Sequence, residues 1–198
     1  TPLLAVWDIV KDAHPEATAI WVGTKTGPEK GLVEEKEMLF FSIPSGKLRR
    51  YLSPLNLIDL GKLIGGFFAS LRLLISERPD VCISAGGFTS VPVHFAAWLI
   101  GIPTWIHQQD VVVGLSNRIM APLAKQVTTA LESSTSQFSK KKTSWLGNPI
   151  RKDILTGSKE RAIELFHLDS DLPVVFVTGG GTGSQRVNQL VGEAGQHL

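Results

Sequence analysis

The stretch Asp80-Val-Cys-Ile-Ser-Ala-Gly-Gly87 begins a segment, residues 80–110, whose pattern is that of a strand, a glycine loop, a helix, a second strand and a polar loop. Residues 91–100 have the apolar density of a packed helix, and the second strand, 104–106, leads into His107-Gln-Gln-Asp110. Ligands of open parallel sheets bind beyond the carboxyl ends of the strands. Function is therefore expected at the glycine pair and the polar tetrad.

The same alternation of helix and strand patterns continues on both sides of this segment. Helices are predicted at 2–13, 29–36, 57–75, 114–124 and 159–167 and from 185 onward, and strands at 17–22, 38–43, 126–130, 144–146 and 173–177. This order predicts an α/β fold with a parallel sheet. Gly147-Asn-Pro149 interrupts the pattern, so we expect an N-terminal domain at 1–149, with a linker and the start of a second domain at 150–198.

Composition indicates an ordinary soluble globular protein. The 198 residues are 43% hydrophobic and 19% charged, and a formal net charge of +2 is too small to argue for a nucleic-acid partner. Cys82 is the only cysteine and lies in an apolar run, so it is interpreted as a small core residue without a disulfide partner in the chain. Because the chain starts inside a helical pattern and stops soon after another helix begins, we expect both ends to be truncated.

One long helix carries a strongly apolar face between residues 57 and 75. That face comprises Leu57, Leu60, Ile64, Phe67, Phe68, Leu71 and Ile75. Charged residues interrupt the run, which excludes a membrane span, and the five basic residues Lys47, Arg49, Arg50, Lys62 and Arg72 outnumber the single acid Asp59. Two interpretations follow, a helix packed in the core or a surface that rests on anionic lipid, and the residues alone favour the core.

Candidate ligand-binding residues lie at predicted strand ends. The loop Thr178-Gly-Gly-Gly-Thr-Gly-Ser184 precedes a helix, where glycines let an anion approach the backbone and the helix dipole favours a phosphate. It matches neither the dinucleotide fingerprint nor the Walker loop, and a tight turn would also use glycines. His107 is either a base or a structural imidazole, and Arg151 either a phosphate clamp or a surface arginine. No metal-ligand cluster is present in the sequence.

Taken together, the motifs resemble those of one enzyme family. They are Ser84-Ala-Gly-Gly-Phe-Thr-Ser-Val-Pro92, Ala96-Ala-Trp-Leu-Ile-Gly-Ile-Pro103, His107-Gln-Gln-Asp110, Gly114-Leu-Ser-Asn117, Gly147-Asn-Pro-Ile-Arg151, and Gly179-Gly-Gly-Thr-Gly183 with Asn188. Their order and spacing are similar to those of the MurG family of bacterial UDP-N-acetylglucosamine transferases. The resemblance implies a GT-B fold of two Rossmann-like domains that face a cleft.

The resemblance also implies an activity. It is the inverting transfer of GlcNAc from UDP-GlcNAc to the 4-hydroxyl of the muramyl sugar of lipid I, an undecaprenyl diphosphate, to form lipid II in peptidoglycan synthesis. Neither a metal nor a cofactor is implied. The implied location is peripheral, on the anionic cytoplasmic face of the bacterial inner membrane, with UDP-GlcNAc and lipid I as the binding partners.

Residue roles follow from the same resemblance. The resemblance implies that Gly86 and Gly87 bind the acceptor diphosphate and that Asp110 and His107 are the candidate catalytic residues. It implies that the donor is bound by Asp110, Arg151, Gly181, Thr182 and Gly183. It also implies a membrane patch formed by Ile64, Phe67, Trp98 and Lys62, so with the resemblance a lipid-binding surface on the long helix is favoured over a core-packed helix.

Three departures from the family pattern are visible. The family's first glycine loop, with its catalytic His, should lie just before Thr1. The family usually has His-Glu-Gln-Asn where this chain has His107-Gln-Gln-Asp110. It usually has Gly-Gly-Ser where this chain has Gly179-Gly-Gly181. The uracil-binding half would lie beyond Leu198, so we expect this chain to be inactive alone. Two alternatives stay open: a non-catalytic, membrane-anchoring half of a split glycosyltransferase, and a GT-B nucleotide-sugar enzyme with another acceptor, such as an epimerase.

Overall fold

The structure, a computed structural model, describes residues 2–27, 29–46, 55–179 and 183–195. The chain forms two compact units, Thr1–Lys152 and Asp153–Leu198. Each unit is described by itself. The predicted residues Lys47, Arg49, Arg50, Gly181 and Thr182 lie outside the described residues.

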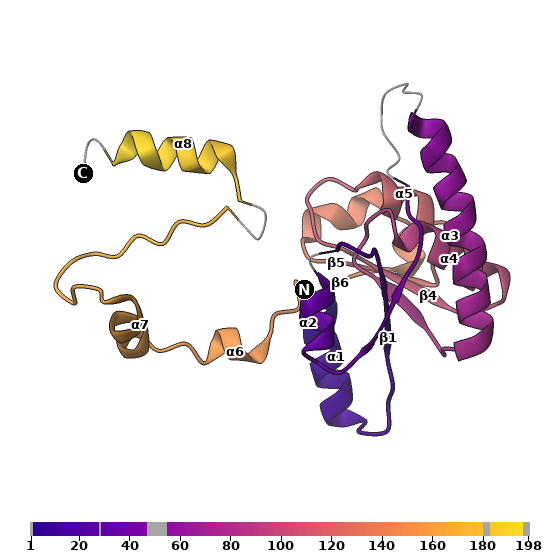
Figure 1. The fold of residues 1–198 in the computed structure, drawn as a ribbon, viewed down its shortest axis with the longest axis horizontal. Helices are drawn as coiled ribbons and strands as arrows, with labels where there is room; N and C mark the ends of the chain where they lie inside the picture. The colour runs from indigo at the N-terminus through magenta and orange to yellow at the C-terminus, as the bar shows by residue number, and fades with distance from the viewer. Residues whose placement is uncertain (1, 28, 47–54, 180–182, 196–198) are drawn as a thin grey trace. The chain divides into compact units, whose positions relative to one another are not determined.

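The first unit contains two parallel sheets (Figure 1). In the smaller sheet, β1 (Ile20–Gly23) pairs with β2 (Leu39–Ser42). The larger sheet has the order β3 (Cys82–Ser84), β4 (Thr104–Gln108), β5 (Gln126–Thr129) and β6 (Thr143–Trp145), and each neighbouring pair is parallel. The predicted α/β class with parallel sheets is therefore confirmed.

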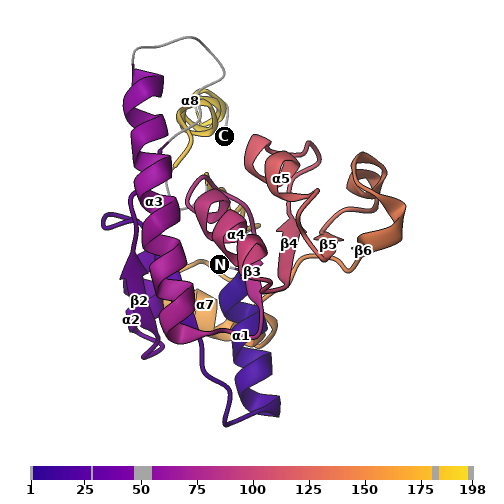
Figure 2. The same cartoon turned by 90° about the vertical axis from the view of Figure 1, so that its right-hand side faces the viewer.

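Helices connect these strands, as parallel pairing requires. They are α1 (Pro2–Ala13), α2 (Glu29–Glu34), α3 (Leu55–Glu77), α4 (Ser90–Leu99) and α5 (Leu115–Met120). Two 3₁₀ helices follow, η1 (Glu132–Gln137) and η2 (Lys140–Lys142), and α6 (Lys152–Leu155) begins where the first unit ends. Figure 2 shows α3 and α4 side by side, and residues of the two helices are in contact.

Three apolar clusters hold the first unit together. One joins Ile43 and Leu74 to α4, and a second surrounds Ile106 and Met120. The third packs α1 and α2 against the small sheet through Leu4. Complete burial of one such aliphatic side chain contributes roughly 1.5–3 kcal/mol. The strands that these clusters hold end at polar or glycine residues, for example Gly23, Ser84 and Gln108. These residues therefore lie at the carboxyl ends of the parallel strands.

The apolar face predicted for α3 is divided between core and surface. Leu74 is buried and Phe67 is half-buried against the first apolar cluster. Four of the predicted residues are instead 51–61% exposed: Leu60, Ile64, Phe68 and Ile75. The interpretation that this face is packed in the core is therefore wrong for these four residues, because the buried side of α3 is a neighbouring one that carries Gly66, Ser70 and Leu74. A Cβ on Gly66 would lie 2.2 Å from the carbonyl oxygen of Pro44.

The second unit contains α7 (Lys159–Phe166) and α8 (Gln185–Ala194), capped by Ser158 and Ser184. The predicted strand at 173–177 is not formed, and Val174, Val175 and Phe176 are 60–85% exposed. A strand needs a neighbouring strand to satisfy its backbone groups. The described residues of this unit include no other strand, which is the physical reason that the prediction fails here.

Candidate functional site

Two consecutive glycines form the turn that follows β3. Gly86 and Gly87 have φ angles of 96° and 99°, in the region that favours glycine. A Cβ on Gly86 would lie 3.0 Å from Oδ1 of Asn117, whereas a Cβ on Gly87 would meet open space. Ser90, the first residue of α4, donates a 2.9 Å hydrogen bond from Oγ to the Gly86 carbonyl. The turn therefore presents bare backbone beside the N-terminus of a ten-residue helix.

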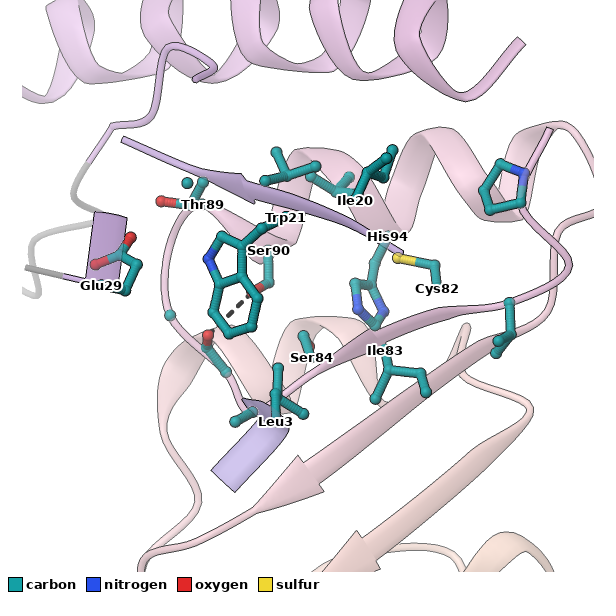
Figure 3. Close-up of a pocket in the computed structure, with 18 of the residues that line it drawn as sticks. Leu3, Ile20, Trp21, Glu29, Cys82, Ile83, Ser84, Thr89, Ser90 and His94 are labelled. Atoms are coloured by element: carbon teal, nitrogen blue, oxygen red, sulfur yellow. Dashed lines mark hydrogen bonds between the residues drawn. The ribbon is translucent and has the colours of Figure 1, made fainter. Parts of the chain in front are cut away.

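A cavity of about 430 Å³ lies beside this turn. Gly86, Gly87 and Gln109 line it, together with the hydroxyl residue Thr89. Figure 3 shows Thr89 and Ser90 at the end of the cavity that faces Glu29, with Trp21 between β1 and β3. Both glycines of the predicted acceptor site thus line a cavity large enough for a small polar ligand.

Buried amides hold the loop that follows β4. Asn117 Nδ2 donates a 2.7 Å hydrogen bond to Gln108 Oε1, and both side chains are buried. Gln108 Nε2 in turn donates to the carbonyl oxygens of Asp110, at 2.9 Å, and Val112, at 3.2 Å. The side chain of Asn117 also lies next to Gly86, where a Cβ would come within 3.0 Å of its Oδ1. The amides of Gln108 and Asn117 therefore connect the polar loop to the glycine turn.

The 3₁₀ helix η1 holds the same loop from the other side. Ser134 Oγ lies 3.1 Å from the carbonyl oxygens of both Asp110 and Val111. Gln137 donates a 2.7 Å hydrogen bond to the Val111 carbonyl and accepts one of 3.2 Å from the Val113 amide. The backbone of the loop is therefore anchored, while the side chain of Asp110 is exposed. The Asp110 carboxylate is therefore accessible to a ligand and is attached to an anchored stretch of backbone.

His107 lies on β4 and is only 5% exposed. Its Nδ1 is 2.9 Å from Oγ1 of Thr128, which also accepts a 2.9 Å hydrogen bond from the indole of Trp105. Burial lowers the pKa of His107, and the Asn148 side chain beside the ring raises it by less. Within the described residues no group completes a hydrogen bond to Nε2. The ring is thus neutral near pH 7 and oriented by Thr128.

The remaining predicted donor residues follow β6 or precede α8. His107, Thr128 and Asn148 line a second cavity of about 180 Å³, and the half-buried Arg151 follows shortly after in the chain. In the second unit, Gly183 has a φ of 73° just before Ser184, which caps α8 by accepting from the Val187 amide at 3.4 Å. The first unit therefore joins the glycine turn to the Asp110 loop through Gln108 and Asn117, whereas His107 lines a different cavity from the two glycines.

The predicted membrane patch lies on α3 and α4. Ile64 is 53% and Trp98 53% exposed, whereas Phe67 is half-buried and its neighbour Phe68 is 61% exposed. The two rings meet edge to face with centroids 5.4 Å apart. Lys62 is exposed and lies 3.7 Å from the Asp59 carboxylate. No helix in the described ranges has the length and apolar character to cross a bilayer.

Comparison with known proteins identifies the family. Residues 1–129 match the glycosyltransferase family 28 N-terminal domain. The chain is 34% identical over 194 residues to the UDP-N-acetylglucosamine--N-acetylmuramyl-(pentapeptide) pyrophosphoryl-undecaprenol N-acetylglucosamine transferase of Shouchella clausii, covering 98% of this chain and 54% of that protein. The chain belongs to glycosyltransferase family 28 and is a MurG homologue. The protein of the same name from Staphylococcus haemolyticus is 38% identical over 177 residues, covering 88% of this chain and 50% of that protein.

Solved structures agree on the fold. The crystal structure of Acinetobacter baumannii MurG matches with a TM-score of 0.67 at 23% identity, over 100% of this chain and 53% of that one. The UDP-GlcNAc 2-epimerase of Neisseria meningitidis, bound to UDP-GlcNAc, matches with a TM-score of 0.55 at 14% identity, over 73% of this chain and 42% of that one. The chain spans about half the length of the MurG relatives.

The sequence does not single out the residues that hold the Asp110 loop in place. Gln108 is notable there only as a departure from the family's His-Glu-Gln-Asn, and Ser134 and Gln137 belong to none of the motifs. The signal for Asn117 was its place in Gly114-Leu-Ser-Asn117. None of these residues reveals its partner in sequence, because the contacts span 9 to 26 positions.

Proposed function

We propose that this chain is the acceptor-binding and membrane-facing half of an enzyme that transfers GlcNAc from UDP-GlcNAc to lipid I, producing lipid II at the cytoplasmic face of the bacterial inner membrane. The observation that carries the proposal is the pair of positive-φ glycines lining a cavity at the carboxyl end of β3, in a chain of the MurG family. The relatives' printed name describes this transfer.

The acceptor diphosphate would bind at Gly86 and Gly87. Two residues without a Cβ let phosphate oxygens approach the peptide groups closely, and the start of α4 adds the positive end of a helix dipole. Gln109, which lines the same cavity, supplies an uncharged amide that donates hydrogen bonds without requiring a counter-ion. This arrangement suits an anion better than an uncharged ligand.

Asp110 is the candidate base, because its carboxylate is exposed whereas His107 is buried. In an inverting transfer a base removes the proton of the acceptor hydroxyl as its oxygen bonds to the anomeric carbon. The bond from that carbon to UDP breaks, and UDP leaves with the electron pair. His107, held by Thr128, would position the end of β4. Arg151 and the loop at Gly181, Thr182 and Gly183 would stabilise the charge on the departing UDP.

Membrane contact would use the exposed apolar side chains of α3 and α4. Ile64, Phe68 and Trp98 present apolar surface that the first unit does not bury, and Lys62 adds a positive charge on α3. Phe67 would support Phe68 from the core side. Such a surface would bring the acceptor cavity to a lipid-linked substrate.

Transfer of labelled GlcNAc to a short-chain lipid I analogue tests the proposal. The gene's full-length product should form the lipid II analogue and lose most activity in the Gly86→Ala variant, whereas the 198-residue chain should be inactive and bind UDP-GlcNAc weakly. Full-length protein that epimerises UDP-GlcNAc, or transfers it to another acceptor, would contradict the acceptor assignment. Full-length protein that binds vesicles without any transfer would favour the non-catalytic, membrane-anchoring half of a split enzyme.

A further inference from the structure

A single acid lines the cavity beside the glycine turn. Among the described residues around this cavity of about 430 Å³, Glu29 carries the only carboxylate. Glu29 begins α2, whereas Gly86 and Gly87 follow β3, so the fold brings to one cavity residues that are far apart in the chain. Figure 3 shows the Glu29 side chain near the end of the cavity that Thr89 lines. Neither the transfer chemistry nor the membrane surface described above uses this acid.

Two glycines make room for the Glu29 carboxylate. A Cβ on Gly23, at the carboxyl end of β1, would lie 2.8 Å from Glu29 Oε1, and a Cβ on Gly27 would overlap both carboxylate oxygens. Gly23 is buried and Glu29 is half-buried. Any other residue at these two positions would displace the carboxylate. The local backbone therefore seats this acid at the carboxyl edge of β1, where ligands of parallel sheets bind.

The Glu29 carboxylate is not engaged within the protein. In the part of the chain that the structure describes, no hydrogen bond or ion pair reaches its oxygens, whereas the next residue, Lys30, pairs with Glu34 at 3.5 Å. An ionised carboxylate only accepts hydrogen bonds, and it has room for several donors. The oxygens of Glu29 are therefore free to accept from a ligand in the cavity.

A carboxylate does not suit the diphosphate expected at Gly86 and Gly87. Like charges repel, and they repel more strongly in a partly buried site than in water. The other polar groups nearby carry no charge: the Thr89 hydroxyl, which caps no backbone amide of α4, and the Gln109 amide. Glu29 therefore fits a part of the ligand that donates hydrogen bonds and lies next to the diphosphate.

We infer that Glu29 recognises the acceptor sugar, by accepting hydrogen bonds from its hydroxyl or acetamido N–H groups. The inference rests on the proposed function, in which the muramyl sugar is attached directly to the diphosphate. A cavity of about 430 Å³ is within the size range of small-ligand pockets, so it can hold the diphosphate and the sugar together. The glycine turn would bind the charged end of the acceptor, and Glu29 would select the sugar that follows it.

Glu29 would thus determine specificity and would not act as the base. Of the described residues, Asp110 lies outside the lining of this cavity, on the loop that follows β4. A contact made equally in the ground state and in the transition state changes KM and leaves kcat unchanged. Loss of the Glu29 charge should therefore raise the KM of the acceptor, whereas loss of a base lowers kcat.

The test measures the binding of two ligands to the full-length protein. One is a short-chain polyprenyl diphosphate that carries the N-acetylmuramyl sugar, and the other is the same diphosphate without the sugar. Glu29→Gln should weaken binding of the sugar-bearing ligand at least about fivefold, because hydrogen bonds to a charged acceptor are stronger than neutral ones. Binding of the sugar-free ligand should be unchanged or tighter, because the repulsion is removed.

Two further variants frame this result. Gly86→Ala should weaken binding of both ligands, because it alters the diphosphate site that they share. Glu34→Gln makes the same substitution at an exposed, ion-paired position of the same helix and should change neither affinity. Thermal unfolding checks that each variant is folded. In the transfer assay, Glu29→Gln should raise the KM of the lipid I analogue about fivefold or more, with kcat and the KM of UDP-GlcNAc unchanged.

Three results would overturn the inference: equal loss of affinity for both ligands in Glu29→Gln, a loss confined to kcat, or a raised KM for UDP-GlcNAc alone. Wild-type binding of both ligands by Glu29→Gln would reject the role of Glu29 and leave the proposed function standing. A full-length protein that binds neither ligand would instead refute the acceptor site itself, and the inference with it.

Discussion

Asn117 on α5 donates a 2.7 Å hydrogen bond to the buried side-chain carbonyl of Gln108 at the end of β4. The bond connects the loop that carries Asp110 with the glycine turn, because Gln108 holds the loop carbonyls and Asn117 lies against Gly86. Positions that seem separate in the chain thereby form one edge of the site.

Replacing Asn117 by Ala should destabilise the fold by about 1–3 kcal/mol, because it leaves the buried Gln108 carbonyl without a donor. Urea unfolding measures the change in the free energy of unfolding. Gln126→Ala is the control: its amide makes an exposed 3.3 Å hydrogen bond to Ser144, so the loss should stay within about 0.5 kcal/mol. Equal losses of unfolding free energy in the two variants would show that the buried hydrogen bond stabilises the fold no more than the exposed one.

The two glycines of the turn should respond differently to alanine. Gly87→Ala introduces a side chain at a φ of 99° with open space around it, a strain of roughly 1–2 kcal/mol. Gly86→Ala adds a contact of 3.0 Å with Asn117 Oδ1 to a similar strain and should cost more. Thermal unfolding of both variants gives the ranking, and a less stable Gly87→Ala protein would contradict it.

Phe68→Glu should weaken binding to anionic vesicles at least tenfold, or about 1.4 kcal/mol, because it puts a negative charge on an exposed apolar side chain of α3. Vesicle sedimentation with the folded variant measures the effect. Ser76→Glu adds the same charge at an exposed polar position of the same helix and should change binding only slightly. Similar losses in both would indicate a general charge effect rather than a docking face.

Acid should destabilise the protein through His94. Burial lowers the pKa of His94 from 6.5 to about 4. Between these two pH values the imidazole of His94 is protonated in the unfolded chain but stays neutral in the folded chain. Stability should therefore fall as the pH drops from 6.5 to 4, by up to about 3 kcal/mol from this residue. His94→Gln should flatten this pH dependence of the free energy of unfolding, while the exposed His14→Gln should not. Identical slopes in the His94 variant and the parent would refute the assignment.

Asp110→Ala in the full-length enzyme should lower turnover at least tenfold, roughly 1.4 kcal/mol of transition-state stabilisation. Asp110→Asn should be much less harmful if the residue only binds the sugar, and comparably harmful if it acts as a base. The dependence of kcat/KM on pH for both variants distinguishes these roles. Wild-type kinetics in Asp110→Ala would remove the residue from the site, and Asp80→Ala, another exposed acid, serves as the control.

Local patterns in the sequence were enough to predict the alternation of helices and strands, the parallel sheets and the glycine turn at Gly86. These features depend on neighbours in the chain: apolar periodicity selects the element, and consecutive glycines permit a φ that other residues avoid. The set of motifs between Ser84 and Asn188 was likewise enough to identify the family, because a motif depends only on residue identity and spacing.

Tertiary structure decided which predicted surfaces are covered. Periodicity shows that α3 has an apolar face, but only its packing through Gly66 puts Leu74 inside and Phe68 outside. The orientation of the His107 ring likewise depends on Thr128, which lies 21 positions away in the chain and 2.9 Å from its Nδ1. The apolar run 173–177 has the composition of a strand and forms none, because a strand depends on a partner that local sequence does not contain.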